Sequence, residues 1–83
     1  MSEPVSSPEA LGSRIKTARR AQRVRQEDLA ATVGSSHRFL RDLERGDASQ
    51  IQRLFAVLAE LGLKLAIDVP PAPPSRPARG HRS

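Results

Sequence analysis

The stretch QEDLAATVGSSHRFLRDLERG, residues 26–46, decides the fold of this 83-residue chain. Two short segments with apolar residues three and four positions apart lie on either side of Gly34, and Gly46 closes the second. This spacing gives a helix one buried face, and glycine ends a helix because it accepts the left-handed conformation at little steric cost. We therefore expect one helix over residues 26–33 and another from a cap at Ser35 or Ser36 to Gly46.

Two short helices joined at a tight glycine turn are the sequence form of a helix-turn-helix. Ala30 is small where the helices would cross, and Gly34 follows four positions later. The apolar positions that would hold the pair together are Leu29, Val33, Leu40 and Leu43. A simple helical hairpin with a solvated charged face is the alternative, but the chain's formal net charge of +5 favours a nucleic-acid partner.

The outer face of the second helix carries polar and basic side chains suited to the major groove of DNA. Arginine can donate two hydrogen bonds to guanine O6 and N7, and serine and histidine can make smaller contacts to base edges. We expect the base-reading residues to be Ser36, His37, Arg38 and Arg41.

Helices are expected on both sides of this pair. Ser7 can cap a first helix that begins at Pro8, a residue favoured at the first helical position. Ser49 can cap a fourth helix, whose broad apolar face ends at Gly62. Residues 8–62 are therefore predicted to form one helical domain of four helices, and the fold class to be all-α.

The segment LKLAIDV, residues 63–69, alternates apolar and other residues as a half-buried strand does. No other segment reads as a strand, and a lone strand leaves its backbone groups unpaired. We expect it to pair with the same segment of a second copy in a two-stranded antiparallel ribbon, which makes a homodimer. The strand residues would be Leu63, Leu65, Ile67 and Val69. A continuation of the fourth helix past Gly62 is the alternative.

The two ends of the chain differ from its middle. Residues 1–7 are predicted to be a flexible N-terminus. Residues 70–83 hold five of the seven prolines and three arginines, which predicts a disordered basic tail that contacts DNA phosphates or a partner, or is solvated with no fixed role. Residues 10–69 carry eleven basic and seven acidic residues, so the expected domain is basic without the tail.

Composition argues against several function classes. The chain has no cysteine, and its two histidines lie far apart, so we expect neither a disulfide nor a metal site. No nucleophile–base pair or paired carboxylates suggest an enzyme, and no cofactor is expected. No apolar run is long enough to span a bilayer, and the first residues do not resemble a signal peptide, so a cytoplasmic protein is expected.

From Ile15 to Leu63 the chain resembles the Xre/Cro-type helix-turn-helix family, which includes phage repressors. The resemblance rests on Arg19, Gln26, Leu29, Ala30, Gly34, Leu40, Leu43, Glu44 and Gly46. With LGLKLAIDV added after the fourth helix, the chain is most similar to HipB-type antitoxins of toxin–antitoxin systems. The fold that this resemblance implies is a lambda-repressor-like domain.

The resemblance also implies roles for individual residues. Arg19 and Glu44 would form a buried structural ion pair. Contacts to DNA phosphates would come from Arg25, Gln26, Ser35 and Arg45. Phe39 stands where the family carries a small polar residue, and it would either pack against the domain or touch thymine methyl groups.

The function implied is that of an antitoxin and transcriptional autorepressor. Such a protein binds a palindromic operator in double-stranded DNA as a dimer and neutralises a HipA-type serine/threonine kinase toxin. A solitary Xre-type regulator without a toxin is the first alternative. A protein-interaction module that does not bind DNA is the second.

Overall fold

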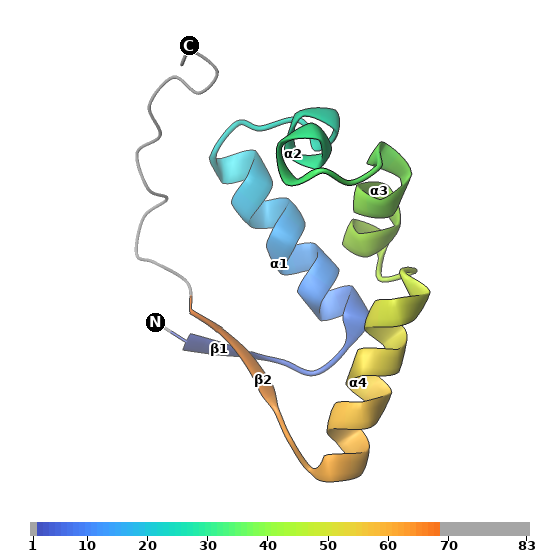
Figure 1. The fold of residues 1–83 in the computed structure, drawn as a ribbon. Coiled ribbons are helices and arrows are strands. Elements are labelled where there is room, and N and C mark those ends of the chain that lie inside the picture. Colours follow the sequence, from blue (N-terminus) through green and yellow to red (C-terminus); the bar gives the residue numbers. More distant parts are fainter. Residues whose placement is uncertain (1, 69–83) are drawn as a thin grey trace.

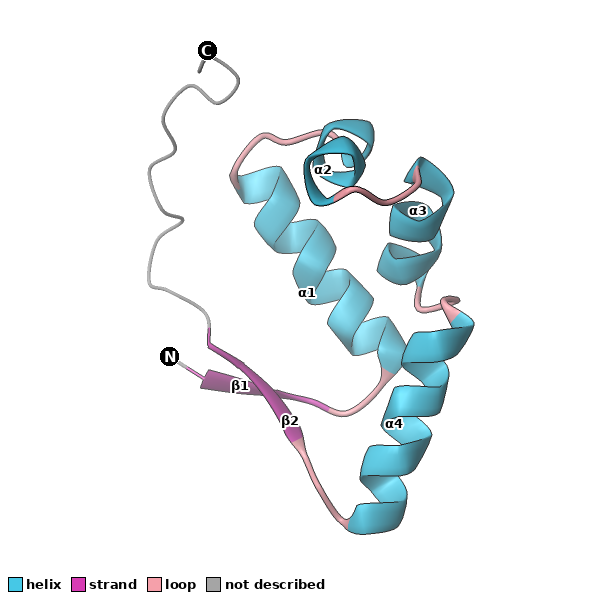
Figure 2. Cartoon of the chain, viewed as in Figure 1, coloured by secondary structure: helices cyan, strands magenta, loops and turns pink. Residues whose placement is uncertain are grey.

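The computed structural model describes residues 2–68, which form four helices and one small sheet (Figures 1 and 2). The elements follow one another as β1 (Ser2–Val5), α1 (Pro8–Ala21), α2 (Gln26–Val33), α3 (His37–Arg45), α4 (Ser49–Leu61) and β2 (Leu65–Asp68). Helix α1 runs diagonally through the molecule, with α2 near its C-terminal end, α3 alongside it and β1 leading into its N-terminal end. The four predicted helices are all present, together with a strand pair. The predicted tail, residues 70–83, lies outside the described residues.

Helix α1 begins as the sequence predicts. The Ser7 hydroxyl accepts a hydrogen bond from the backbone N–H of Ala10 at 3.1 Å, and Pro8 is the first helical residue. Glu9 lies in the first turn, where the helix dipole favours a negative charge. Because cap, proline and acidic residue all favour the same start, the position of α1 is determined locally.

The central pair of helices also has its predicted bounds. Gly34 adopts the left-handed conformation, with φ of +74°, and ends α2. Of the two candidate caps for α3, the structure uses Ser36, whose hydroxyl accepts from the backbone N–H of Phe39 at 3.0 Å. Gly46, with φ of +84°, ends α3. The turn therefore holds only Gly34, Ser35 and Ser36.

Helix α4 ends at Gly62 as predicted, but its cap differs from the prediction. Ala48 takes the extended cap conformation and Ser49 is already helical, so the expected cap at Ser49 is wrong. Ala48 is buried, and the side-chain amide of Gln52 donates to the backbone oxygen of Gly46 at 3.0 Å. The turn before α4 is therefore held by apolar burial and by Gln52 rather than by a serine.

The strand predicted over residues 63–69 is present as β2, Leu65–Asp68. Leu63 precedes it and is exposed, Leu65 and Ile67 are half-buried, and Val69 lies outside the described residues. The expectation that this strand has no partner in its own chain is wrong, because β1 pairs with it antiparallel, with Val5 opposite Leu65. The predicted ribbon between two copies therefore has only the other edge of β2 available.

Strand β1 was not predicted, because Ser-Glu-Pro-Val carries one large apolar residue and a proline. Proline donates no backbone hydrogen bond and is tolerated at a sheet edge, where Pro4 lies. Val5 is buried, and Glu3 forms an ion pair with Arg14 of α1. These two contacts hold the N-terminal residues against the helical domain.

The apolar core is small. Its buried members are Val5, Ala30, Leu40 and Ala48. Leu29 and Leu43 are half-buried, as a helix pair held together by them requires, but Val33 is 61% exposed and its predicted inward position is wrong. Val33 is the last residue of α2, and there the chain already turns away towards Gly34. No residue of α4 is buried.

Candidate nucleic-acid interface

The four residues expected to read bases lie together at the N-terminal half of α3. Ser36 caps the helix, and His37, Arg38 and Arg41 follow within its first two turns. All four are exposed, and the Arg38 side chain is 82% exposed. No element among residues 2–68 covers this face, so the surface that must enter a DNA groove is accessible.

One side of α3 packs against the domain. Leu40 and Glu44, four residues apart, are its buried members. Residues at this spacing lie one above the other on a helix. Arg38 lies on the other side of the helix from these anchoring residues, whereas His37, three positions before Leu40, lies at the exposed N-terminal end of the same side.

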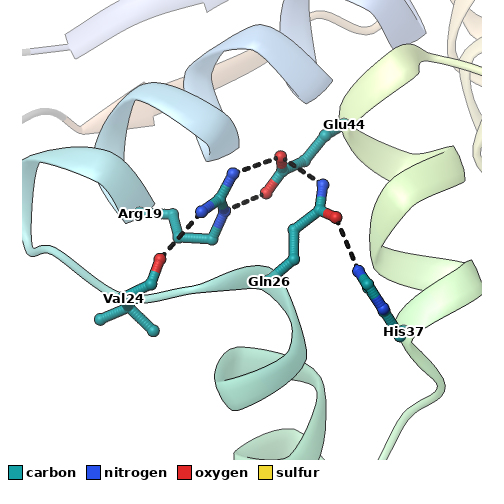
Figure 3. A network of polar contacts seen from close by, with 5 residues as sticks. All are labelled: Arg19, Val24, Gln26, His37 and Glu44. Atoms are coloured by element: carbon teal, nitrogen blue, oxygen red, sulfur yellow. Dashed lines mark hydrogen bonds and ion pairs between the residues drawn. The ribbon is translucent and has the colours of Figure 1, made fainter.

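The buried carboxylate of Glu44 is neutralised by a bidentate ion pair with Arg19 of α1 (Figure 3). Arg19 Nε donates to Oε2 at 2.6 Å and Nη2 donates to Oε1 at 2.9 Å. A third bond, from Nη1 to the backbone oxygen of Val24, lies at 2.8 Å. The two side chains are 10% and 3% exposed, so the structure ties α1 to the C-terminal half of α3 through a desolvated pair.

The pair also sets the charge states at the site. Hydrogen bonds from Arg19 lower the pKa of Glu44, although burial opposes this effect. The hydrogen bond to Glu44 raises the pKa of Arg19 in turn. Both side chains are therefore charged at neutral pH, and α3 carries on its buried side a carboxylate that only accepts hydrogen bonds.

Gln26, the first residue of α2, connects this carboxylate near the end of α3 to His37 at the start of the same helix. Its side-chain Nε2 donates to Oε1 of Glu44 at 2.9 Å, and its Oε1 lies 2.9 Å from Nε2 of His37 (Figure 3). The expectation that the Gln26 side chain lies near the third helix agrees with this position. The bond to His37 was not predicted, because residues eleven positions apart on different helices leave no periodic signal.

The other residues expected to contact phosphates lie around the same end of the domain. Arg25 immediately precedes α2, and its Nε lies 3.2 Å from Oδ2 of Asp28 in the same helix. The hydrogen bond to Asp28 raises the pKa of Arg25, which keeps its charge. Ser35 is half-buried in the turn, and Arg45 is exposed at the end of α3. Both cations of this set, Arg25 and Arg45, therefore lie on the surface.

Phe39 is 40% exposed on α3, between Arg38 and the buried Leu40. The ring is partly accessible to solvent, and the two roles considered for it stay predictions. Asp42 lies one turn beyond Arg38, with 3.9 Å between Oδ2 and the Arg38 Nε. At that distance the carboxylate weakly restrains a guanidinium that is otherwise free to move.

Two other kinds of site are absent from residues 2–68. No helix there is long and apolar enough to cross a membrane. No group of three or more histidine, cysteine, aspartate or glutamate side chains in that range could hold a metal ion.

Comparisons with known proteins match the same region. Residues 15–67, more than half of the chain, match the helix-turn-helix family. An uncharacterized HTH-type transcriptional regulator, y4mF of Sinorhizobium fredii (strain NBRC 101917 / NGR234), is 34% identical over 71 residues. That alignment covers 84% of this chain and 93% of the relative. No solved structure matches the chain significantly.

Proposed function

The chain belongs to the helix-turn-helix family, and we propose that it is a DNA-binding transcriptional regulator that inserts α3 into the major groove. The observation that carries this proposal is the exposed face formed by Ser36, His37, Arg38 and Arg41, on a helix fixed from behind by the Arg19–Glu44 pair. The name of the Sinorhizobium relative, a transcriptional regulator, supports it.

Two groups of side chains make different contributions to binding, one to sequence preference and one to affinity. Arg38 and Arg41 donate to guanine edges, which gives sequence preference. Arg25, Gln26, Ser35 and Arg45 contact the phosphates on either side of the groove, which gives most of the affinity and makes it depend on salt. Asp47, just after α3, bears the opposite charge and limits how closely that end approaches the backbone.

We propose that the regulator acts as a homodimer on a palindromic operator. One helix-turn-helix reads only a few base pairs, and a dimer places two recognition helices about 34 Å apart along the DNA. An exposed apolar face on α4 supports a second copy as the partner: Leu54, Val57 and Leu61, three and four positions apart, are 42%, 53% and 66% exposed.

This face continues towards the sheet. Phe55 and Leu58 of α4 border a hollow of about 270 Å³ that Val5 of β1 and Leu65 of β2 also line. Contiguous exposed apolar surface on a small domain marks an interaction site. The proposed dimer buries the α4 face, and the free edge of β2 at the same end forms the ribbon expected from residues 63–69.

In its finer form, the proposal is a cytoplasmic antitoxin and autorepressor that neutralises a HipA-type serine/threonine kinase. Support comes from the similarity to HipB-type antitoxins, in which a strand segment follows the fourth helix, and from β2 following α4 and Gly62 here. The runner-up is a solitary Xre-type regulator. A kinase reading frame beside the gene, whose toxicity this chain suppresses on co-expression, distinguishes the two.

Fluorescence anisotropy tests the DNA-binding proposal. The duplex is the DNA upstream of the chain's own gene, and the control is a shuffled duplex of equal length and composition. We expect tighter binding to the upstream duplex, and an affinity for both that falls steeply with salt. Equal affinity for the two duplexes at every salt concentration would leave only non-specific binding and contradict a sequence-specific regulator.

A further inference from the structure

The exposed imidazole of His37 is joined to the interior by a chain of hydrogen bonds. Arg19 holds the Glu44 carboxylate, Glu44 accepts from Gln26, and the Gln26 amide meets His37 (Figure 3). Residues from three helices form this series of hydrogen bonds, and its outermost residue, His37, is expected to touch DNA. Through this series of hydrogen bonds, the buried ion pair determines which groups of Gln26 and His37 donate and which accept.

The first constraint acts on the side-chain amide of Gln26. A carboxylate only accepts hydrogen bonds, so the amide must turn its NH₂ group towards Oε1 of Glu44. The opposite orientation would place two oxygen atoms against each other in a desolvated site. Because the hydrogen bonds from Arg19 lower the pKa of Glu44, the carboxylate persists at neutral pH. The Gln26 oxygen is therefore fixed towards His37.

The second constraint acts on the imidazole. An amide oxygen only accepts, so Nε2 of His37, 2.9 Å away, must carry the proton and donate it. A neutral imidazole has one N–H, and the hydrogen bond made by one ring nitrogen sets the role of the other. Nδ1 is then an acceptor. It has no hydrogen-bond partner within residues 2–68, and the residue is exposed.

We propose that His37 reads an operator base through Nδ1 as a hydrogen-bond acceptor, and so selects a base with an exocyclic amino group. In the major groove such groups are N6 of adenine and N4 of cytosine, whereas guanine presents only the acceptors O6 and N7. This inference rests on the proposed function, because it assigns a specificity to one of the four base-reading residues.

The assignment complements the neighbouring readers. Arg38 and Arg41 can only donate, so they favour guanine. His37 adds a hydrogen-bond acceptor to the same exposed surface. A neutral His37 could donate to a base only in the other tautomer, which abandons the hydrogen bond to Gln26. Loss of one hydrogen bond corresponds to a roughly three- to tenfold preference for an amino-bearing base at this position.

Nitrogen-15 NMR of the free protein tests whether the hydrogen bonds from Glu44 through Gln26 set the tautomer of His37. In a His81→Gln background only His37 gives an imidazole signal. At about pH 8, where histidine is ordinarily neutral, we expect a protonated Nε2 with an exchange-protected N–H and an unprotonated Nδ1. Gln26→Ala should abolish the exchange protection, and Gln50→Ala, an exposed glutamine of α4, should not. A protonated Nδ1, or exchange protection of the imidazole N–H that survives in Gln26→Ala, would show that Gln26 does not set the tautomer.

Selection from a pool of random duplexes tests the base preference. We expect one operator position to hold adenine or cytosine with the wild-type chain and to change to guanine with His37→Arg, which can only donate. Gln26→Ala should relax that position alone and weaken overall affinity as well. A wild-type guanine at the position that responds to residue 37, or no responding position, contradicts the reading role of Nδ1.

The two experiments separate this inference from the proposed function. If other operator positions are selected and respond to Arg38→Ala, the regulator proposal stands even when His37 shows no base preference. If no position is selected by any form of the chain, the proposed function fails and the base-reading role fails with it. The NMR result then still decides whether the buried pair sets the tautomer.

Discussion

Gly12 of α1 lies directly against the backbone of Glu44 in α3. A Cβ atom on Gly12 would stand 2.6 Å from the Glu44 backbone oxygen, closer than real Cβ atoms approach backbone. Arg19, seven residues or about two turns further along α1, grips the side chain of the same Glu44. One residue of the recognition helix is therefore held at its backbone and at its carboxylate by the same helix.

Gly12→Ala should destabilise the domain by about 1–3 kcal/mol, because an added methyl group must push α1 and α3 apart. Helix propensity alone predicts the reverse sign, since alanine favours an exposed helix interior over glycine by about 1 kcal/mol. Urea unfolding measures the difference, with Ser13→Ala at the neighbouring exposed position as the control. A Gly12→Ala variant as stable as the wild type would show that the crossing is not tight.

Glu44→Gln should make the domain less stable at neutral pH by about 3–5 kcal/mol, because it leaves the Arg19 charge buried without its partner. The folded state lowers the pKa of Glu44 from its ordinary value of 4.5. The carboxylate therefore contributes stability above that value, and this contribution is lost as pH falls through the folded-state pKa.

The measurement is the unfolding free energy of both proteins from neutral to acidic pH. The gap between them should be largest near neutrality and should narrow below the ordinary pKa of glutamate. Glu60→Gln, at an exposed position of α4, is the control and should leave stability nearly unchanged. A gap that stays constant into acid would mean that the ion pair is not the source of the loss.

Arg38→Ala should reduce operator preference more than it reduces binding to random DNA. A lost arginine–guanine contact removes about 1–3 kcal/mol of discrimination at one base pair, while its share of the phosphate attraction is small. Arg53→Ala, an exposed cation on α4 away from the recognition helix, is the matched control. Anisotropy titrations on the operator and on a shuffled duplex give both quantities, and an equal loss on the two duplexes would rule out base reading by Arg38.

The helices could be predicted from sequence because their ends are encoded locally. Ser7 with Pro8, and the left-handed glycines at 34 and 46, act within a few residues of the backbone that they terminate. Strand β1 escaped prediction because its stability is not local. Ser2–Val5 pairs with residues sixty or more positions away, and its attachment to the domain depends on Val5 and on the contact between Glu3 and Arg14.

The same distinction applies to the candidate interface. The exposed face of α3 follows from helical periodicity, so its members could be named from the sequence. The contacts that organise it join separate helices: Gly12 touches Glu44, and Gln26 bridges Glu44 to His37. No spacing rule within one helix reveals such contacts. Only the resemblance to a known family suggested the pairing of Arg19 with Glu44.

Val57→Asp should convert the proposed dimer into a folded monomer. Val57 is 53% exposed at the centre of the apolar face of α4, so an aspartate there is solvated in the monomer but buried without a partner in the dimer. Ala56→Asp adds the same charge on the other side of α4, with Arg53 and Glu60, and is the matched control. Sedimentation equilibrium gives the mass of each variant, and circular dichroism checks that the helices remain.

Ile67→Asp tests the strand part of the same interface. Ile67 is half-buried and lies opposite Glu3 in the strand pair. An aspartate there repels Glu3, and it also disfavours the approach of a second copy at the free edge of β2. Monomers from both variants, and dimers from Ala56→Asp, are the expected result for an interface that spans α4 and β2. A Val57→Asp protein that keeps its dimeric mass would exclude the α4 face. An Ile67→Asp protein that does so would exclude the ribbon.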